Sequence, residues 1–373
     1  MSFDHNIRIS CNDKTITGWQ GYSITNDVLT PADGFSLSLE LTKELWELCS
    51  LDSEIGVFID DTQILSGFIG SRSKTSSMSG TTMVISGRDR VGRLVDESAP
   101  QFKYGGLKIK DLAQRIVGDW FGSVTLQNTK NRNLVRSTKA RKSKVNREPS
   151  KDGETITTPI NDSRIVVPGS LGKDFAKKVM PGQSRMQVLE EVCKELRLLA
   201  WSSANGKEIF IGLPAYEQDP QYFFTQYADP NQRTNCVITV REDIEDMYSE
   251  YTVIGANKKR ATVSGEGFQQ RKRLVFRDDN VKTQADALDR VERERLKRET
   301  DKLEIDITVP GHSQIIENTA PVIFAADTMA SVVDELTGLS GLYYITAVTF
   351  NRSRDSGSTT DLKLVPKGTA LQL

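Results

Sequence analysis

Two stretches of strict apolar–polar alternation constrain the fold of this chain more than any other feature. They run from residue 35 to 41 (FSLSLEL) and from residue 303 to 309 (LEIDITV). Because successive side chains of a β-strand point to opposite faces of the sheet, each stretch predicts a strand with one buried face. In the first stretch that face carries Phe35, Leu37, Leu39 and Leu41. The chain is therefore expected to be mainly β.

Shorter apolar segments follow each alternation in the same order. After the first alternation they occupy residues 57–59, 64–69 and 83–85, and a hairpin turn is expected between 59 and 64. After the second alternation they occupy residues 322–324, 342–350 and 361–365. Upstream, residues 21–25 have an expected counterpart in residues 250–254, and residues 327–341 are interpreted as an added segment.

This shared order of five elements predicts an internal duplication. The expected fold class is mainly β with α+β insertions, built from two similar small antiparallel β-barrel domains at residues 1–98 and 233–373. Chance similarity between alternating strands is the alternative that the sequence leaves open.

Residues 99–232 are expected to form an α+β module between the two copies. Apolar residues at helical spacing predict amphipathic helices at 107–118 and 185–198. Ser184 and Gln187 predict a capping box at the start of the second helix. A hairpin that turns at Asn205–Gly206 is expected to follow it.

Residues 129–168 interrupt this module with a segment poor in large apolar side chains. Between residues 130 and 147 it contains no acid and eight cations, which are Lys130, Arg132, Arg136, Lys139, Arg141, Lys142, Lys144 and Arg147. Contact with a neighbouring protein, or simple solvation, is favoured for this run. Nucleic-acid binding is the alternative, although the run lacks the interleaved aromatic residues on which bases stack.

A second interruption, at residues 284–299, is predicted to be a highly charged helix. Ion pairs between residues four apart are expected for Asp286/Arg290, Asp289/Arg293 and Glu294/Arg298. The narrow apolar stripe is expected to comprise Ala285, Leu288, Val291 and Leu296. Such a helix is typical of a protein surface or of contact with another chain.

The overall charge argues against a protein that coats nucleic acid. There are 49 Lys+Arg against 50 Asp+Glu, a formal net charge of −1. Without the eight cations of the basic run, 41 (49 − 8) bases face 50 acids, so an acidic body is expected. No apolar run approaches the roughly 20 residues of a membrane span. Residues 1–5 show no start of a secretory signal, so assembly in a cytoplasm is expected.

The motifs of enzyme and metal sites are missing from the sequence. Cys11, Cys49, Cys193 and Cys236 are far apart, so reduced buried thiols are expected rather than a zinc site. Neither His5 nor His312 lies in a nucleophile setting. Neighbouring acids such as Asp60 and Asp61 favour turns over the opposed carboxylates of glycoside hydrolysis. No catalytic residue, metal ligand or cofactor is predicted.

Three separated blocks resemble the baseplate hub (tail) proteins of Mu-like contractile-tailed bacteriophages. They contain Gly18–Trp19 with Tyr22–Thr25, then GRDR at 87–90 with LVD at 94–96, then SEYTVIG at 249–255 with the helix after it. The motif residues that the resemblance marks as structural are Trp19, Arg88, Asp89, Asp96, Glu250 and Tyr251. The blocks span residues 18–365, but residues 129–168 depart from the family pattern, so no role is inherited there.

The resemblance implies a virion protein and a homotrimer, related to the wider hub family of contractile injection systems. Two similar domains in each of three chains would form a pseudo-six-fold ring. Such a ring would join a six-fold tail tube, or a tube-initiator protein, to a three-fold central spike. Its channel would carry the tape measure protein and later DNA, and neighbouring baseplate proteins would contact its outside.

Two other functions stay open on the sequence. A tail-tip cell-wall hydrolase is the main alternative, although the missing acid pair or metal cluster disfavours it. A DNA-binding packaging or regulatory protein would need salt-dependent affinity carried by residues 130–147.

Overall fold

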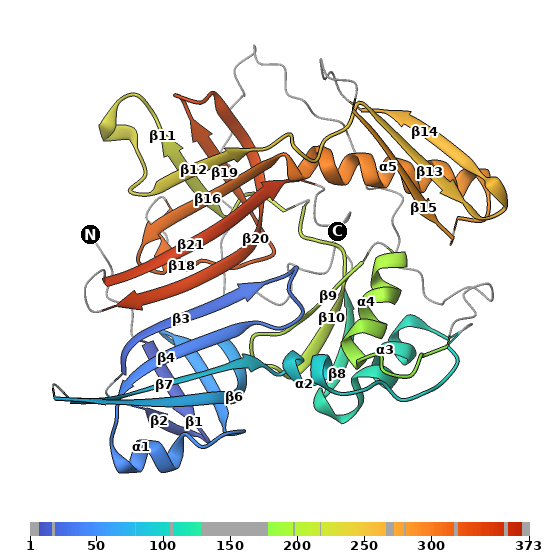
Figure 1. Ribbon diagram of the computed structural model, residues 1–373. Coiled ribbons are helices and arrows are strands. Elements are labelled where there is room, and N and C mark those ends of the chain that lie inside the picture. The colour runs from blue at the N-terminus through green and yellow to red at the C-terminus, as the bar shows by residue number, and fades with distance from the viewer. Residues whose placement is uncertain are drawn as a thin grey trace.

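A computed structural model shows a chain built largely from antiparallel strands (Figure 1). The prediction of a mainly β chain is therefore confirmed. The structure describes residues 7–16, 19–78, 80–104, 107–127, 178–196, 198–216, 218–265, 272–279, 281–316, 320–353 and 357–367.

The first β unit contains the first alternation. Its elements are β1 (Ile7–Cys11), β2 (Lys14–Ile16), β3 (Trp19–Asp27), β4 (Gly34–Glu40), α1 (Lys43–Leu48), β5 (Glu54–Ile59), β6 (Thr62–Ser77) and β7 (Gly80–Asp89). On β4, Phe35, Leu37 and Leu39 are buried as the alternation predicts, while Leu41 is half-buried beyond its end. The expected hairpin joins β5 to β6.

The second β unit contains the second alternation. Its elements are β11 (Tyr222–Gln226), η4 (Pro230–Gln232), β12 (Val237–Glu242), β16 (Leu303–Pro310), β17 (Ser313–Gln314), β18 (Val322–Ile323), β19 (Thr328–Asp334), β20 (Leu339–Ser353) and β21 (Gly357–Pro366). Ile305, Ile307 and Val309 of β16 are buried.

Six strands of each unit correspond in their order of pairing. The order β3-β4-β7-β6-β5-β1 in the first matches β12-β16-β21-β20-β19-β11 in the second, although β1 pairs antiparallel with β5 whereas β11 pairs parallel with β19. The long strands β6 and β20 both carry a β-bulge, at Gly70 and Thr346 respectively. Because bulges are specific local features, their common position supports duplication rather than chance.

Two aspartates in left-handed backbone conformation mark the same position in each unit. Asp52 (φ 69°) precedes β5, and Asp327 (φ 60°) precedes β19. The backbone N–H of Asp52 donates to the carbonyl of Ile69 at 2.9 Å, and that of Asp327 donates to Ile345 at 3.0 Å. A non-glycine residue seldom adopts a positive φ, so this match is a second sign of common architecture.

The structure corrects two of the expected correspondences. The counterpart of β3 is β12 and not residues 250–254, which form a separate sheet with two other strands. The counterpart of β5 is β19, so residues 327–341 are no added segment but contain a repeated strand. Residues 322–323 form only the short strand β18, which pairs with β17.

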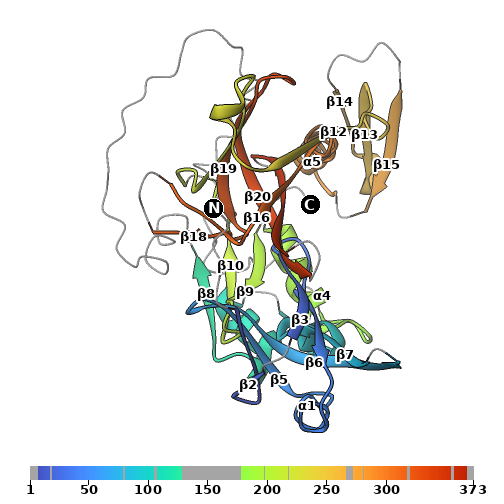
Figure 2. The same ribbon diagram turned by 90° about the vertical axis from the view of Figure 1, so that its left-hand side faces the viewer.

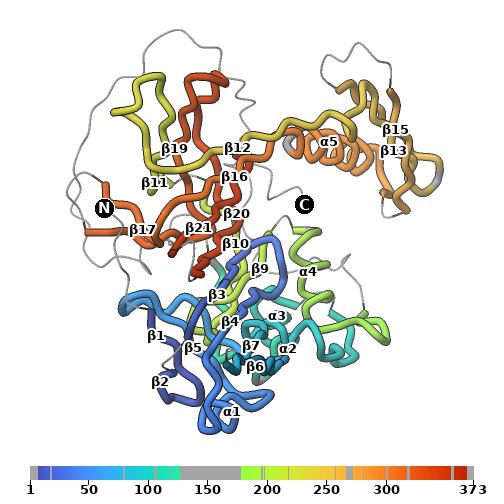
Figure 3. Tube along the Cα trace, turned by 60° about the vertical axis from the view of Figure 1, so that its left-hand side comes forward, coloured from blue at the N-terminus to red at the C-terminus, as the bar shows by residue number. Residues whose placement is uncertain are grey.

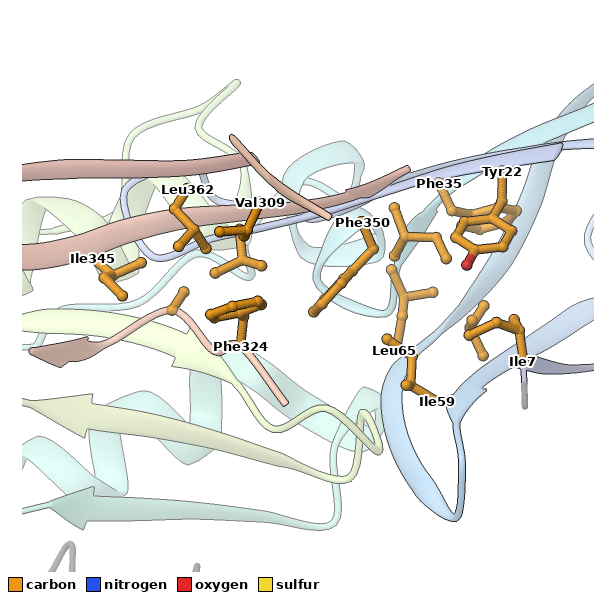
Figure 4. Close-up of a cluster of buried hydrophobic side chains, with 14 of the residues drawn as sticks. Ile7, Tyr22, Phe35, Ile59, Leu65, Val309, Phe324, Ile345, Phe350 and Leu362 are labelled. Carbon is orange, nitrogen blue, oxygen red and sulfur yellow. The ribbon is translucent and has the colours of Figure 1, made fainter. Parts of the chain in front are cut away.

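The two predicted β-barrel domains are not closed barrels. β20 pairs with β3, which joins both units into one open 13-stranded sheet. Their apolar side chains consequently form one cluster. Figure 4 shows Phe350 of β20 between the side chains of the second unit, such as Leu362, and those of the first, such as Leu65.

The middle module packs helices against a small sheet. It comprises α2 (Val91–Asp96), α3 (Ile109–Val117), η1 (Gly118–Trp120), β8 (Ser123–Gln127), α4 (Arg185–Glu195), β9 (Leu199–Ser202) and β10 (Glu208–Gly212). Both predicted helices are confirmed, and so is the capping box of Ser184 and Gln187. The predicted hairpin joins β9 to β10, with Gly206 at φ 65° in its turn.

A third unit, the arm, stands apart from the continuous sheet (Figures 2 and 3). It consists of β13 (Glu250–Gly255), η5 (Ala256–Lys258), β14 (Arg260–Ser264), β15 (Arg273–Asp278) and α5 (Gln284–Asp301). The predicted charged helix is confirmed, but its buried residues are Ala287 and Val291, whereas Leu288 is 51% exposed. The helix packs on the sheet formed by β13, β14 and β15, so the residues that face this sheet are the buried ones.

Two glycines at the junction of β6 and β7 give a test of the packing. A Cβ at Gly87 would lie 2.0 Å from the carbonyl oxygen of Phe68, whereas at Gly70 the nearest heavy atom would be 3.8 Å away. We therefore expect Gly87→Ala to lower the free energy of unfolding by about 1–3 kcal/mol. Gly70→Ala is the matched control and should change it by less than about 0.5 kcal/mol. Urea denaturation of both variants measures the difference, and equal losses would contradict the close strand approach at Gly87.

Candidate functional site: the seam between the two β units

The pairing of β3 with β20, which we call the seam, is the feature that makes the two units one body. Six residues of each strand pair in antiparallel register, from Asp27 opposite Ala347 to Tyr22 opposite Arg352. The buried face of the seam contains Ile24 and Phe350, which pair with each other. Burying side chains of this size contributes about 1.5–3 kcal/mol each, so the seam is a packed interface rather than a loose contact.

A fully buried histidine ties the second unit to the first across the seam. The hydroxyl of Thr360 donates to the carbonyl of Gly311 at 2.7 Å, so it accepts the hydrogen bond from His312 Nδ1 at 2.9 Å. His312 Nε2 can then accept from the hydroxyl of Tyr22 at 2.6 Å. A neutral imidazole with its proton on Nδ1 satisfies this whole arrangement. His312 is thus a structural residue.

Trp19 lies at the same end of the seam. Its ring packs edge-on against Tyr22, with 5.4 Å between centroids. The guanidinium of Arg352 on β20 lies 5.0 Å from the centroid of the Trp19 ring. This cation–π contact is a further link from one unit to the other.

Asp89 connects the first β unit to the middle module. It is buried, and its carboxylate accepts from the backbone N–H of Val91 at 3.0 Å and from the hydroxyl of Ser202 at 2.9 Å. Burial raises the pKa of Asp89 to about 7, partly offset by the hydrogen bond from Ser202. Burial, and then the charge of Asp89, also raises the pKa of the neighbouring Asp33 well above its usual value.

Arg88 and Asp96 form an ion pair between β7 and α2. Both side chains are exposed, so the pair orients the helix and adds little stability. Two further ion pairs, Arg90 with Glu54 and Arg93 with Asp52, also join α2 to the first unit. The GRDR and LVD motifs therefore form the junction between the first β unit and the middle module.

Glu250 and Tyr251 lie in the arm and not at the seam. The Glu250 carboxylate is 3.5 Å from the guanidinium of Arg273 on the neighbouring strand. Tyr251 is fully buried under α5, and its hydroxyl accepts from the backbone N–H of Tyr248 at 3.0 Å. Both residues are placed to hold the arm together.

The ion pairs of α5 follow the sequence prediction only in part. Asp289/Arg293 and Glu294/Arg298 are present, at 3.1 and 2.9 Å. Asp286 instead accepts backbone hydrogen bonds at the helix start, which lower its pKa. Arg290 pairs with Asp278 on β15 at 2.9 Å, and this bond fastens the helix to its sheet.

The solvent side of the continuous sheet carries short hydroxyl side chains on eight adjacent strands, and we call it the hydroxyl face. Its hydroxyl residues, none of them buried, are Ser23, Thr25, Ser36, Ser38, Ser71, Ser73, Thr75, Thr82, Ser86, Thr239, Thr308, Thr349 and Thr359. Hydrogen bonds cross it, as between Thr25 and Thr349 at the seam (3.2 Å). Lys363 pairs with Glu304, and Arg241 lies 3.0 Å from Asp306, so basic and acidic groups compensate.

The structure therefore brings Trp19 to the seam and places Arg88, Asp89 and Asp96 together at the junction of the first β unit with the middle module. The eight basic candidates at 130–147 lie outside the described residues. Sequence reasoning missed the structural role of His312, which depends on a partner 290 residues away. In the described part of the chain, no three His, Cys, Asp or Glu side chains are grouped to hold a metal ion. Within that part, no helix combines the length and apolar character needed to cross a membrane.

The first β unit matches a known family. Residues 6–89 fit the family model of the Mu phage baseplate assembly protein GpP-like, N-terminal domain. The resemblance to Mu-like baseplate proteins is thus confirmed. The matched segment ends at Asp89, where the middle module begins. A comparison with curated proteins finds no significant match.

Solved structures share the fold over nearly the whole chain. A tail protein from Neisseria meningitidis MC58 is 20% identical with a TM-score of 0.74, covering 98% of this chain and 98% of that one. The 43 kDa tail protein of prophage MuSo2 from Shewanella oneidensis is 16% identical with a TM-score of 0.77, covering 98% and 99%. The E. coli c3393 protein, a type VI secretion component described as similar to T4 tail proteins gp27 and gp5, is 10% identical with a TM-score of 0.50, covering 98% and 78%.

Proposed function

We propose that this protein is a structural, non-enzymatic hub of a phage tail baseplate. It acts as a homotrimer that adapts the six-fold symmetry of a tail tube, or of a tube-initiator protein, to the three-fold symmetry of a central spike. The family match of residues 6–89 and the fold shared with prophage tail proteins support a place in the tail.

The observation that carries the proposal is the seam. Two equivalent β units lie side by side in one chain and share a continuous sheet. Three such chains supply six units, and repetition of the same lateral contact closes a ring in which each unit meets a similar neighbour. A ring of this kind has true three-fold and approximate six-fold symmetry, which suits partners of either symmetry.

In this proposal, the two β units form the ring wall. They belong to the predicted domains 1–98 and 233–373, with β11 added to the second, and the rest of 99–232 lies outside the wall. The eight strands with the hydroxyl face would contribute 24 strands in three chains. At about 4.8 Å between strands, their circumference is about 115 Å, so the ring is at least about 35 Å across. The hydroxyl face is turned inward, because the other face of the sheet is covered by the core and by further strands.

The proposed channel carries the tape measure protein and then DNA. Its wall is hydroxyl-rich, with paired charges. The described cations at its centre are neutralised by carboxylates, so the wall offers little that would retain a phosphate backbone. The basic run at 130–147 is proposed to contact a neighbouring baseplate protein. No cofactor is proposed, and assembly takes place in the host cytoplasm.

Mass measurement in solution tests the ring. We expect a trimer at micromolar concentration by light scattering, either alone or after addition of the spike protein. A chain that lacks residues 130–147 is the control and should give the same trimer, because the ring contacts lie in the β units. A stable monomer under both conditions would overturn the proposal.

A further inference from the structure

Two strand edges remain open at opposite ends of the pairing pattern. β12 pairs with β16 on one side, and within the described residues no strand pairs with its other side. β6 pairs with β5 only up to Phe68, so one side of its second half lacks a partner strand in the described chain. The β6–β7 hairpin projects away from the rest of the molecule (Figure 1). Open edges of this length are templates for pairing with another chain.

These open edges are the equivalents of the two strands that meet at the seam. β6 corresponds to β20, since each pairs with the strand after it and carries its bulge at the same place. β12 corresponds to β3, since each pairs with an alternating strand, β16 or β4. The contact that β20 makes with β3 inside one chain is therefore available to β6 of one chain and β12 of another.

The rungs of the sheet give the register of this second contact. One row across the first unit contains Ser71, Ser86, Ser36 and Ser23. The equivalent row across the second contains Ala347, Lys363, Asp306 and Thr239. At the seam Ser23 pairs with Asn351, four residues beyond Ala347. The residue four beyond Ser71 is Thr75, so Thr75 is assigned the position opposite Thr239.

The side chains around this register are complementary. The same count places Arg72 opposite Glu242, and Glu242 is exposed. Arg72 already lies over the Trp46 ring, 4.0 Å from its centroid, so its guanidinium is held near the edge. Ile238 takes the position of Tyr22. At the seam, Tyr22 contacts His312, which follows β16. The equivalent of β16 in the first unit is β4, which is followed by α1, so Ile238 would contact α1. In that helix, Leu45 and Trp46 are only half-buried.

We propose that β12 of one copy of this chain pairs antiparallel with residues 72–76 of β6 in a second copy, with Thr239 opposite Thr75. This inference rests on the proposed trimer and names the surfaces that close it. This contact between chains has the same strand pairing as the seam. In place of the Tyr22–His312 hydrogen bond of the seam, it has an Arg72–Glu242 salt bridge and an apolar contact of Ile238 with α1.

Cysteine cross-linking tests the register in the full chain. Thr75→Cys and Thr239→Cys are combined in a Cys236→Ser background, because the half-buried Cys236 lies close to the site. Oxidation, or a short bis-maleimide, should convert more than half of the chains into covalent dimers and trimers on a denaturing gel. The matched control combines Thr75→Cys with Val240→Cys, which points to the opposite face of the sheet. It should cross-link at least five-fold less.

Cross-linking read together with the mass in solution separates the two proposals. A trimer by mass that gives no cross-link, or equal cross-linking in the control, overturns the β6–β12 pairing and leaves the trimeric hub intact. A monomer by mass, with or without spike, overturns the hub and this pairing with it. Cross-linking into dimers and trimers by the Thr75/Thr239 pair alone supports both.

Discussion

His312→Ala is expected to lower the free energy of unfolding by about 3–5 kcal/mol. The imidazole is fully buried, so its removal leaves a cavity between the two β units. It also deletes the acceptor for the Tyr22 hydroxyl and the donor to Thr360. Urea denaturation, monitored by circular dichroism, measures the loss of unfolding free energy.

Two variants show whether the loss comes from the tie across the seam. Tyr22→Phe removes one hydroxyl and should cost about 1–2 kcal/mol. Combined with His312→Ala, it should add almost nothing, because the hydrogen bond is already lost. Thr42→Ala changes the equivalent position of the first unit, where the side chain caps α1, and should cost only about 1 kcal/mol. Additive effects of the first two substitutions would show that no such hydrogen bond joins the units.

Asp89 should make the protein less stable as the pH rises from about 4 to about 7. Its pKa in the folded chain is raised to about 7, so the folded carboxyl keeps a proton that the unfolded chain releases. Wherever the unfolded state binds fewer protons, the free energy of unfolding falls with increasing pH. Below that interval both states are protonated, and above it both are ionised, so this contribution is constant on either side.

Asp89→Asn removes this titration. Relative to the natural chain, the variant should gain on the order of 2–4 kcal/mol in unfolding free energy between pH 4 and pH 8. Denaturant titrations across that range measure the difference between the two curves. Ser202→Ala serves as the companion variant. Loss of a hydrogen bond that lowers the pKa of Asp89 should move the upper end of the interval to higher pH. Parallel curves for Asp89→Asn and the natural chain would contradict the raised pKa.

Local sequence patterns predicted those helices and strands that are specified by residues close together in the chain. The alternation at 35–41 is sufficient to specify β4, because burial of Phe35, Leu37 and Leu39 follows from period two alone. The capping box at Ser184 likewise fixes the start of α4 through contacts three residues apart. The strands β4 to β7 and both helices of the middle module could therefore be predicted, whereas β1, β2 and α1 of the first unit were not.

Pairings between distant residues could not be predicted in the same way. β19 lacks alternation because both its faces carry buried residues such as Met329 and Ala330, so its strand pattern was hidden. Residues 250–254 resemble residues 21–25 in sequence, with Tyr251 in the position of Tyr22. In the structure, however, the counterpart of β3 is β12. The pairing of β3 with β20, which creates the site at His312, could not be predicted, because no local sequence pattern shows which strand edges pair with each other. The basic run at 130–147 lies outside the described residues, so its role stays a prediction.

The seam has a consequence for how the proposed ring would assemble from dilute chains. Six separate units would need six encounters, and every joint would weaken as the concentration falls. A chain that already holds two units together makes three of those joints unimolecular, and these form at any concentration. Only the three joints between chains then obey mass action. In the proposed ring, duplication within one chain would thus lower the protein concentration at which a closed ring outcompetes its open fragments, before any partner has bound.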